Sequence, residues 1–171
     1  MYNIGDKVVY GSNGAMTVID MRDEMIGDTS RKYYVLKSAS DNSASLTFVP
    51  VDNEKLVSAM RPLLSEEEIR ALVRGADDIP LLRWVEDNRA RSEGFKKIVE
   101  SGDRIQLISL IKSVIATGVR RSAEGKKNYL ADEAAMHKAE HVLYSEVAAV
   151  FCIAEEAVPE LLASMREEIK K

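Results

Sequence analysis

Hydrophobic and polar residues alternate with a period of two along roughly the first 57 residues. The alternation is clearest in 7–10, 15–19, 32–36 and 45–49, and turn-forming glycine, aspartate and asparagine residues separate these stretches. This pattern is typical of short antiparallel strands. Pro50 is expected to end the last strand because proline has no amide hydrogen to donate. We therefore predict a small antiparallel sheet or barrel. The residues predicted to fill its core are Val8, Tyr10, Val18, Tyr34, Leu36 and Val49.

After about residue 60 the apolar residues follow a helical period. Ser65 and the three glutamates after it have the sequence of a capping box, which predicts a helix over about 66–74. Pro80 suits the first turn of a second helix, which would carry Leu81, Leu82, Trp84 and Val85 and continue to Val99.

Three more helices are predicted toward the end of the chain. Asp103 can cap a helix that is apolar over a wide arc and runs to Gly118. The pattern then predicts helices over about 130–153 and 155–170. The chain is therefore expected to be α+β, with a β domain over residues 1–60 and an all-helical domain over residues 61–171.

Positive charge is concentrated in the middle of the sequence. Residues 83–127 carry eleven lysines and arginines beside six acids, whereas the segments before and after them are acidic. Such segregation is typical of a surface that binds a polyanion, because lysine and arginine release counterions from nucleic acid phosphates. The alternative is a set of ordinary solvated helix faces. The net charge of −4 for the whole chain favours local over general binding of nucleic acid.

Several classes of protein are not favoured by the composition. No apolar run approaches the roughly 20 residues that span a bilayer, and the first residues lack the pattern of a signal peptide, so we expect a cytoplasmic protein. Cys152 is the single cysteine, and its apolar neighbours predict a buried, reduced thiol without a chemical role. We see neither an activated nucleophile nor a glycine-rich cofactor loop. We therefore expect neither an enzyme nor a cofactor.

Two motifs offer alternative interpretations. His137, Glu140 and His141 have the spacing of the inverted zinc peptidase motif, in which two imidazoles on one helix hold a metal. The pattern also arises by chance in charged helices, and we expect two exposed histidines. Four tyrosines of the sheet could form an aromatic cage for a methylated cation, although packing within the strands is the more common use of tyrosine. These tyrosines are Tyr2, Tyr10, Tyr33 and Tyr34.

A β-rich module followed by a helical module with its positive charge at the front resembles the CarD/CdnL-like bacterial transcription regulators. The resemblance covers most of the chain, and it is the order of the motifs that makes it specific. The motifs are Gly5-Asp6-Lys7-Val8-Val9-Tyr10 with Gly14, Tyr34-Val35-Leu36, Val49-Pro50-Val51-Asp52-Asn53, Arg61-Pro62-Leu63, Trp84 with the arginines after it, and Ser101-Gly102-Asp103.

This resemblance implies a Tudor-like antiparallel β-barrel that binds the β subunit of RNA polymerase, followed by a helical domain that contacts promoter DNA. Proteins of this kind stabilise the open promoter complex at the upstream edge of the bubble. The implied polymerase-binding residues are Met21, Arg22, Met25, Ile26 and Phe48. The implied DNA-binding residues are Arg83, Trp84, Arg89, Arg91, Lys96 and Lys97.

Trp84 has two possible roles. An indole can fill an unstacked step or the edge of the minor groove while nearby arginines hold phosphates. It can equally pack in the helical core, because its neighbours Leu81, Leu82 and Val85 are apolar. The chain is acidic overall, so we expect weak DNA binding by the free protein and stronger binding when polymerase holds it at the promoter.

Overall fold

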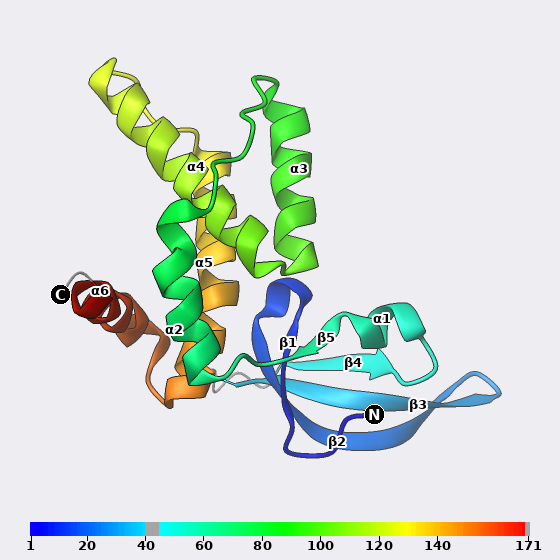
Figure 1. Ribbon diagram of the computed structural model, residues 1–171. Helices are drawn as coiled ribbons and strands as arrows, with labels where there is room; N and C mark the ends of the chain where they lie inside the picture. Colours follow the sequence, from blue (N-terminus) through cyan, green and yellow to red (C-terminus); the bar gives the residue numbers. More distant parts are fainter. Residues whose placement is uncertain (40–44, 170–171) are drawn as a thin grey trace.

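The computed structural model describes residues 1–39 and 45–169 and has a five-stranded antiparallel sheet followed by a helical region (Figure 1). This is the α+β organisation that the sequence predicts. The strands are β1 (Lys7–Tyr10), β2 (Ala15–Ile26), β3 (Thr29–Ser38), β4 (Leu46–Pro50) and β5 (Met60–Pro62). A 3-10 turn, η1 (Gly11–Asn13), follows β1, and a short helix, α1 (Glu54–Ser58), precedes β5.

The sheet is open. Its strand order is β4-β3-β2-β1-β5 and every pairing is antiparallel, so β4 and β5 are its two edges. Helix α1 contacts both edge strands and lies between them. Of the predicted sheet or barrel, the sheet is what forms: the barrel does not close, because the edge strands β4 and β5 are short and do not pair with each other.

The apolar alternation predicted the core of the sheet well. Val8, Val18, Tyr34, Leu36 and Val49 are each at most 1% exposed and form one cluster with Met16 and Met60. Tyr10, which was also predicted in this core, is half-buried at its margin.

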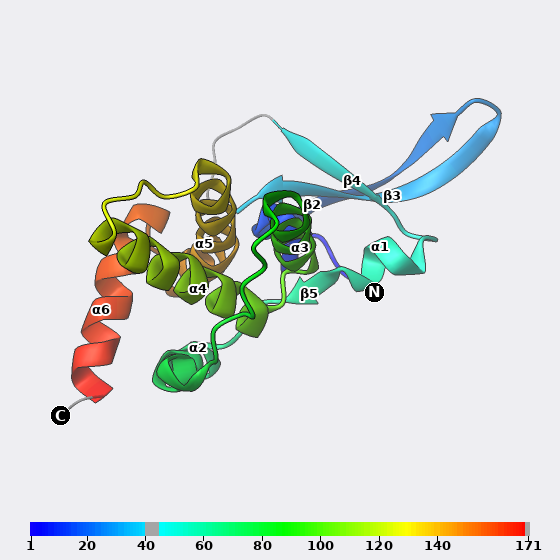
Figure 2. The same ribbon diagram turned by 90° about the horizontal axis from the view of Figure 1, so that it is seen from above.

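Strands β2 and β3 form a long hairpin that projects beyond the rest of the sheet (Figure 2). Their register runs from Met16 opposite Ser38 to Ile26 opposite Thr29, with a bulge at Ile19. Gly27 turns the chain at the tip with φ = 61°, a backbone conformation that glycine adopts without steric cost. The distal half of β2 is therefore paired on one side only.

The helical region contains α2 (Glu66–Gly75), α3 (Asn88–Ser101), α4 (Arg104–Ala123), α5 (Leu130–Phe151) and α6 (Val158–Ile169). Two 3-10 turns, η2 (Ala76–Asp78) and η3 (Glu155–Ala157), follow α2 and precede α6. The predicted capping box is present at α2, where the Ser65 hydroxyl accepts from the Glu68 amide and the Glu68 carboxylate accepts from the Ser65 amide. Asp103 caps α4 as predicted, and α4 continues past Gly118 to Ala123.

The helix predicted to begin at Pro80 is wrong in its first part. Residues 79–87 are irregular and contain no helix, and α3 begins only at Asn88, where Asp87 provides the cap. The polar groups of this segment bond instead to side chains of α4. Such tertiary hydrogen bonds override the local helical pattern.

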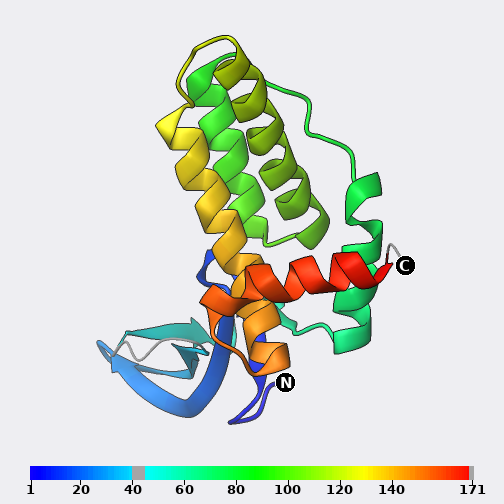
Figure 3. The same cartoon turned by 90° about the vertical axis from the view of Figure 1, so that its left-hand side faces the viewer.

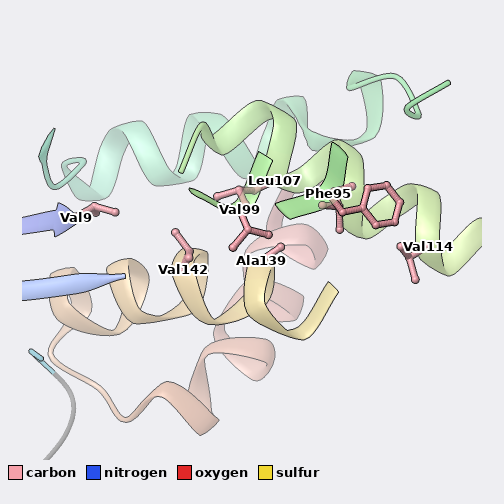
Figure 4. Packing of buried hydrophobic residues seen from close by; sticks show 8 residues of the cluster. Val9, Phe95, Val99, Leu107, Val114, Ala139 and Val142 are labelled. Atoms are coloured by element: carbon pink, nitrogen blue, oxygen red, sulfur yellow. The ribbon is translucent and has the colours of Figure 1, made fainter. Parts of the chain in front are cut away.

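The core of the helical region lies between α3, α4 and α5 (Figure 4). It is formed by Phe95, Val99, Leu107, Leu110, Val114, Ala139 and Val142, and Val9 of the sheet joins the same cluster. Because adjacent residues of a strand point to opposite faces, β1 places Val8 in the sheet core and Val9 in the helical core. The two cores therefore meet at β1.

A close contact joins β2 to α5. The Ala15 amide donates to the buried Ser145 Oγ at 2.9 Å. A Cβ on Gly14 would lie 2.2 Å from the same oxygen, so only glycine fits there without a shift. Near the other end of this interface, an Arg61 guanidinium N–H donates to the Gly102 carbonyl and Arg104 bonds to Glu146 at 2.6 Å. The first contact fixes β2 on α5, the Arg61 bond ties β5 to the turn between α3 and α4, and the Arg104 pair ties α4 to α5.

Cys152 is exposed, so the prediction of a buried thiol is wrong. Its apolar neighbours did not reveal that α5 ends there, with Cys152 in the left-handed conformation at φ = 55°. Among the described helices, none is long and apolar enough to cross a membrane.

Candidate interaction surfaces

The first candidate surface is the outer edge of the β2–β3 hairpin. On this side β1 pairs with β2 only up to Thr17, and the Gly5 amide donates to the Val18 carbonyl. Within the described ranges 1–39 and 45–169, no strand pairs with this edge from Met21 to Ile26. An unpaired edge offers a row of main-chain donors and acceptors to an incoming strand.

Of the five residues predicted to bind polymerase, four lie on β2 of this hairpin and Phe48 lies on β4. Met25 and Ile26 are at its tip and are 67% and 61% exposed. Arg22 and Phe48 lie together nearer its base, with the Arg22 guanidinium carbon 5.1 Å from the Phe48 ring centroid. Met21 is half-buried and packs against the sheet core.

Phe48 is supported from two sides. It is 41% exposed, and its ring meets that of Tyr33 edge-on at 6.3 Å. Arg22 also pairs with Glu24 at 2.8 Å. Arg22 thus reaches from β2 across β3 to the stacked rings of Tyr33 and Phe48, and Phe48 itself lies on β4, on the opposite side of the hairpin from the unpaired edge.

The second candidate surface is the end of the helical region that lies farthest from the sheet. The 79–87 segment reaches this end and is held on α4 by hydrogen bonds. Ser109 Oγ donates to the Pro80 carbonyl at 2.5 Å, and the Leu82 amide donates to Ser113 Oγ at 2.8 Å. Lys112 Nζ donates to three carbonyls at the end of α2 and the start of the segment. The segment that carries Arg83 and Trp84 is therefore fixed.

Trp84 is half-buried against the helical core. Its ring meets Phe95 edge-on at 6.2 Å, and the Arg91 guanidinium carbon lies 4.7 Å from its centroid. These are contacts of a packing residue. A role for Trp84 as a wedge in DNA stays a prediction.

Arg91 does not lie on the surface. It is 3% exposed and its Nε donates to both carboxylate oxygens of Asp132 at 3.0 and 3.1 Å. Its remaining nitrogens donate to the Val85 carbonyl at 2.8 Å and to Asn88, and its plane lies between the rings of Trp84 and Tyr129, each at 4.7 Å. We therefore remove Arg91 from the predicted phosphate contacts, because its donors are occupied inside the protein.

The other predicted DNA-binding cations are exposed, but acids accompany two of them on α3. Arg89 is paired with Glu93 at 3.3 Å and Lys96 with Glu100 at 3.7 Å, both one turn apart. Arg83 and Lys97 are also exposed. Exposed pairs of this kind are weak and exchange readily with other anions. The four cations therefore stay accessible to phosphate, but Arg83 and Arg89 lie at the far end, whereas Lys96 and Lys97 lie in the half of α3 that leads to the sheet, where Lys96 and Ser12 of η1 line one hollow.

The structure adds further cations at the end of the helical region that lies away from the sheet (Figure 3). Residues 120–127 contribute Arg120, Arg121, Lys126 and Lys127, and of these Arg121 borders a small hollow that Trp84 and Tyr129 also line. Arg121 stacks on Tyr129 at 4.0 Å and donates to the Lys127 carbonyl. A hydrogen bond from Lys126 lowers the pKa of Glu124. The basic composition of this segment was visible in the sequence, but the stacking of Arg121 on the same tyrosine that faces Arg91 was not.

The zinc interpretation finds no support in the geometry. Both histidines are exposed, as predicted, but each faces a different carboxylate. His137 Nδ1 lies 2.9 Å from Glu140, and His141 Nδ1 lies 2.8 Å from Glu155. Among residues 1–39 and 45–169 there is no group of three or more His, Cys, Asp or Glu side chains that could hold a metal.

The tyrosine cage is not formed by the four rings. Tyr33 and Tyr34 are adjacent on β3 and so point to opposite faces, one toward Phe48 and the other into the sheet core. Tyr2 packs edge-on against Tyr34 at 6.0 Å and its hydroxyl donates to the Met60 carbonyl. Burial raises the pKa of both Tyr2 and Tyr10. The rings serve packing and do not converge on one opening.

The fold and these surfaces define a protein with an open sheet, an unpaired hairpin edge and a helical region whose far end is cationic. A comparison with protein-family models identifies the sheet more closely. Residues 2–64 match the CarD-like/TRCF RID domain, so this chain has such a domain at its beginning, followed by a helical region. A comparison with curated proteins found no match.

Proposed function

We propose that this protein is an RNA polymerase-interacting transcription factor. In this proposal the hairpin edge binds the polymerase β subunit, and the cationic end of the helical region contacts promoter DNA near the upstream edge of the bubble. The contact with DNA then stabilises the open promoter complex. The observation that carries the proposal is the match of residues 2–64 to the CarD-like/TRCF RID domain.

The shape of the hairpin supports a strand-addition mode for the polymerase contact. The edge from Met21 to Ile26 has its main-chain groups unpaired by any described strand, and Met25 and Ile26 add exposed apolar surface at the tip. Main-chain hydrogen bonds of an added strand provide affinity with little dependence on sequence, while neighbouring side chains provide specificity. Arg22 and Phe48 are placed to supply that specificity.

The charge distribution supports a DNA contact that depends on polymerase. The exposed cations Arg83, Arg89, Lys96 and Lys97 lie in a chain whose net charge is −4, so we expect weak binding of free protein to DNA. Binding to polymerase converts the DNA contact into an intramolecular one and raises its effective concentration. Both partners place the activity in the bacterial cytoplasm.

A pull-down with the isolated β lobe tests the polymerase contact. Ile26→Glu places a carboxylate where the added strand would pack, and it should abolish capture because desolvating an unpaired charge is costly. Leu130→Glu is the matched control, since Leu130 is 82% exposed and lies on α5. Equal capture of both variants and the wild-type protein would contradict the proposed edge.

The lifetime of open complexes tests the DNA contact. Arg83→Ala combined with Arg89→Ala should leave β-lobe capture intact and shorten the lifetime, and each lost phosphate contact should reduce the salt slope of binding by roughly one. Arg74→Ala, an exposed change on α2, is the control. An unchanged lifetime at every salt concentration would place the DNA contact elsewhere.

A further inference from the structure

Two consecutive residues of α5, Ser145 and Glu146, hold the sheet on both sides of β1. Ser145 Oγ accepts from the Ala15 amide at the start of β2. Glu146 Oε1 accepts at 2.9 Å from the Leu64 amide, in the segment that leads from β5 to α2. Because β1 lies between β2 and β5 in the sheet, these two bonds attach α5 to the chain on either side of β1.

Arg104 of α4 adds to the attachment of the same connecting segment. Its guanidinium donates to both carboxylate oxygens of Glu146, at 2.6 and 2.8 Å, and to the Pro62 carbonyl at 3.2 Å. The side chains of this ion pair are 18% and 4% exposed. A bidentate pair of this kind has a defined geometry. The pair therefore holds the main chain on both sides of Leu63.

The side chains of the connecting segment are also anchored. Met60 belongs to the sheet core, Leu63 packs against the core of α3, α4 and α5, and Leu64 packs on a cluster that α2, α5 and α6 form. The Arg61 guanidinium donates to the Gly102 carbonyl at the end of α3. The segment is therefore fixed to the sheet and to the helical region along its length.

Two separate attachments oppose rotation as well as separation. With the connecting segment alone, the helical region could turn about that segment, whereas the bond between Ala15 and Ser145 on the other side of β1 opposes the turn. Val9 of β1 packs in the helical core between the two attachments. The hairpin edge should therefore keep one orientation relative to the exposed Arg83 and Arg89 at the far end.

We propose that Arg61, Arg104 and Glu146 are positioning residues, which hold the polymerase-binding edge and the DNA-contacting cations in one relative orientation. In this proposal they contact neither partner. A rigid connection gives the cations a higher effective concentration at DNA than a flexible connection of the same length, because less freedom is lost on binding. The effect on open complexes rests on the proposed function, whereas the rigidity can be measured on the free protein.

Spin-label distances in the free protein test the rigidity. Asp28→Cys places one label at the exposed tip of the hairpin, and Leu130→Cys places the other at the start of α5, where Leu130 is 82% exposed. Cys152→Ser removes the single cysteine of the chain. Pulsed electron resonance on this parent protein should give one narrow distribution of distances between the two labels.

Two variants of the labelled parent loosen the connection without leaving a buried charge unpaired. Arg61→Ala removes the donor to the Gly102 carbonyl. Arg104→Met combined with Glu146→Leu removes both partners of the ion pair, and apolar replacements of this kind are often neutral for stability. Both variants should broaden the distance distribution. Asn53→Ala, which removes the cap of α1 in the sheet, is the control and should leave the distribution narrow. A circular dichroism melt checks that each variant is folded.

Open-complex lifetime tests the consequence, with the same substitutions in the unlabelled chain. Arg104→Met combined with Glu146→Leu should leave capture of the isolated β lobe and the weak binding of free DNA unchanged. It should nevertheless shorten the lifetime of open complexes by about threefold or more, because the effective concentration of the cations falls. A purely stabilising role would not separate the lifetime from the two binary affinities.

Three results would overturn the proposal. A broad distribution in the labelled parent would show that the connection is not rigid. Narrow distributions in both variants would show that these residues do not produce the rigidity. An unchanged open-complex lifetime in variants whose distributions do broaden would show that the orientation does not matter. Failure of the wild-type protein to capture the β lobe would instead reject the proposed function, and the label distances would still decide whether these residues fix the orientation.

Discussion

The sheet and the helical region use their polar groups in opposite ways. The hairpin leaves main-chain groups of β2 and the side chains of Met25 and Ile26 exposed at its edge and tip. The helical region instead places several of its charged groups inside. Arg91 is the clearest example, with its guanidinium enclosed by Asp132, two aromatic rings and main-chain carbonyls. A basic stretch of sequence is therefore not equivalent to a basic surface.

Arg104 and Lys112 are two more cations of the helical region whose charged groups bond within the protein. Arg104 bonds to Glu146 and the Pro62 carbonyl, and the hydrogen bond to Glu146 is the main reason that its pKa is raised. Lys112 joins the end of α2 to the 79–87 segment through three carbonyls. The charges left for a partner are the exposed ones, among them Arg83, Arg89, Lys96 and Lys97.

Removing the buried cation of the helical region should cause the largest loss of stability. Arg91→Ala leaves Asp132 buried without its partner, and the free energy of unfolding should fall by about 3–5 kcal/mol. Urea unfolding followed by circular dichroism measures this. Arg89→Ala, two residues away and 90% exposed in its side chain, should change stability by less than about 0.5 kcal/mol. Similar losses for both variants would show that Arg91 is not an internal residue.

The next largest loss of stability is expected where the sheet contacts α5. Gly14→Ala brings a Cβ within 2.2 Å of Ser145 Oγ and also forces φ = 72° on alanine, so we expect a loss of about 1–3 kcal/mol. Gly27→Ala has a similar positive φ of 61° but meets no atom within 4 Å, and it isolates the backbone contribution. Thermal unfolding of the two variants compares them. Equal losses would mean that the contact with Ser145 tolerates a shift.

The start of the helical region offers a smaller test. Ser65→Ala removes the hydroxyl that caps α2, and the expected loss is about 1 kcal/mol. Ser65→Gly should cost less than the alanine variant, because glycine is the better cap of the two. Chemical unfolding of both variants measures the difference. A larger loss for glycine than for alanine would argue against a capping role.

Replacing the Glu68 carboxylate should change stability the least of these substitutions, and the size of the change should depend on pH. Hydrogen bonds from the Ser65 amide, and then from its hydroxyl, lower the pKa of Glu68 in the folded protein. Its stabilisation is therefore complete above the unfolded pKa and is lost as pH falls through the folded pKa. Glu68→Gln should be less stable than the wild-type protein at pH 7, and the difference should shrink on acidification. Urea midpoints from pH 7 to pH 3 measure this, with Glu67→Gln as the control for charge at the helix start. A difference that grows in acid would contradict the assignment.

The parts of the fold that depend on local chemistry could be predicted from the sequence. Period-two alternation located Val8, Val18 and Leu36 in the sheet core, and Ser65 with Glu68 located the start of α2. Both patterns involve residues only a few positions apart, so the local sequence is enough to recognise them.

The predictions from the sequence were wrong where residues far away in the chain determine the local structure. The 79–87 segment has a helical apolar pattern, but its Pro80 carbonyl and Leu82 amide bond to Ser109 and Ser113 of α4, and it contains no helix. Arg91 resembles Arg89 in sequence, and only Asp132, 41 residues away, makes it internal. The open form of the sheet likewise depends on how far each strand follows its neighbour. Whether the predicted hairpin and cationic residues bind their partners depends on those partners and stays a prediction.

Helix α5 fixes both the distance and the rotation about its axis between two of the contacts that it makes. It contacts β2 through Ser145 and holds Arg91 through Asp132, which lie about 20 Å apart at 1.5 Å per residue. Inserting one residue between these positions would rotate one end of the molecule by about 100° relative to the other while adding little length. Because Ser145 lies at the sheet and Asp132 lies near the far end of the helical region, the number of residues between them helps to set how the hairpin and that far end are oriented, together with the packing of α3 and α4 on β1 and η1.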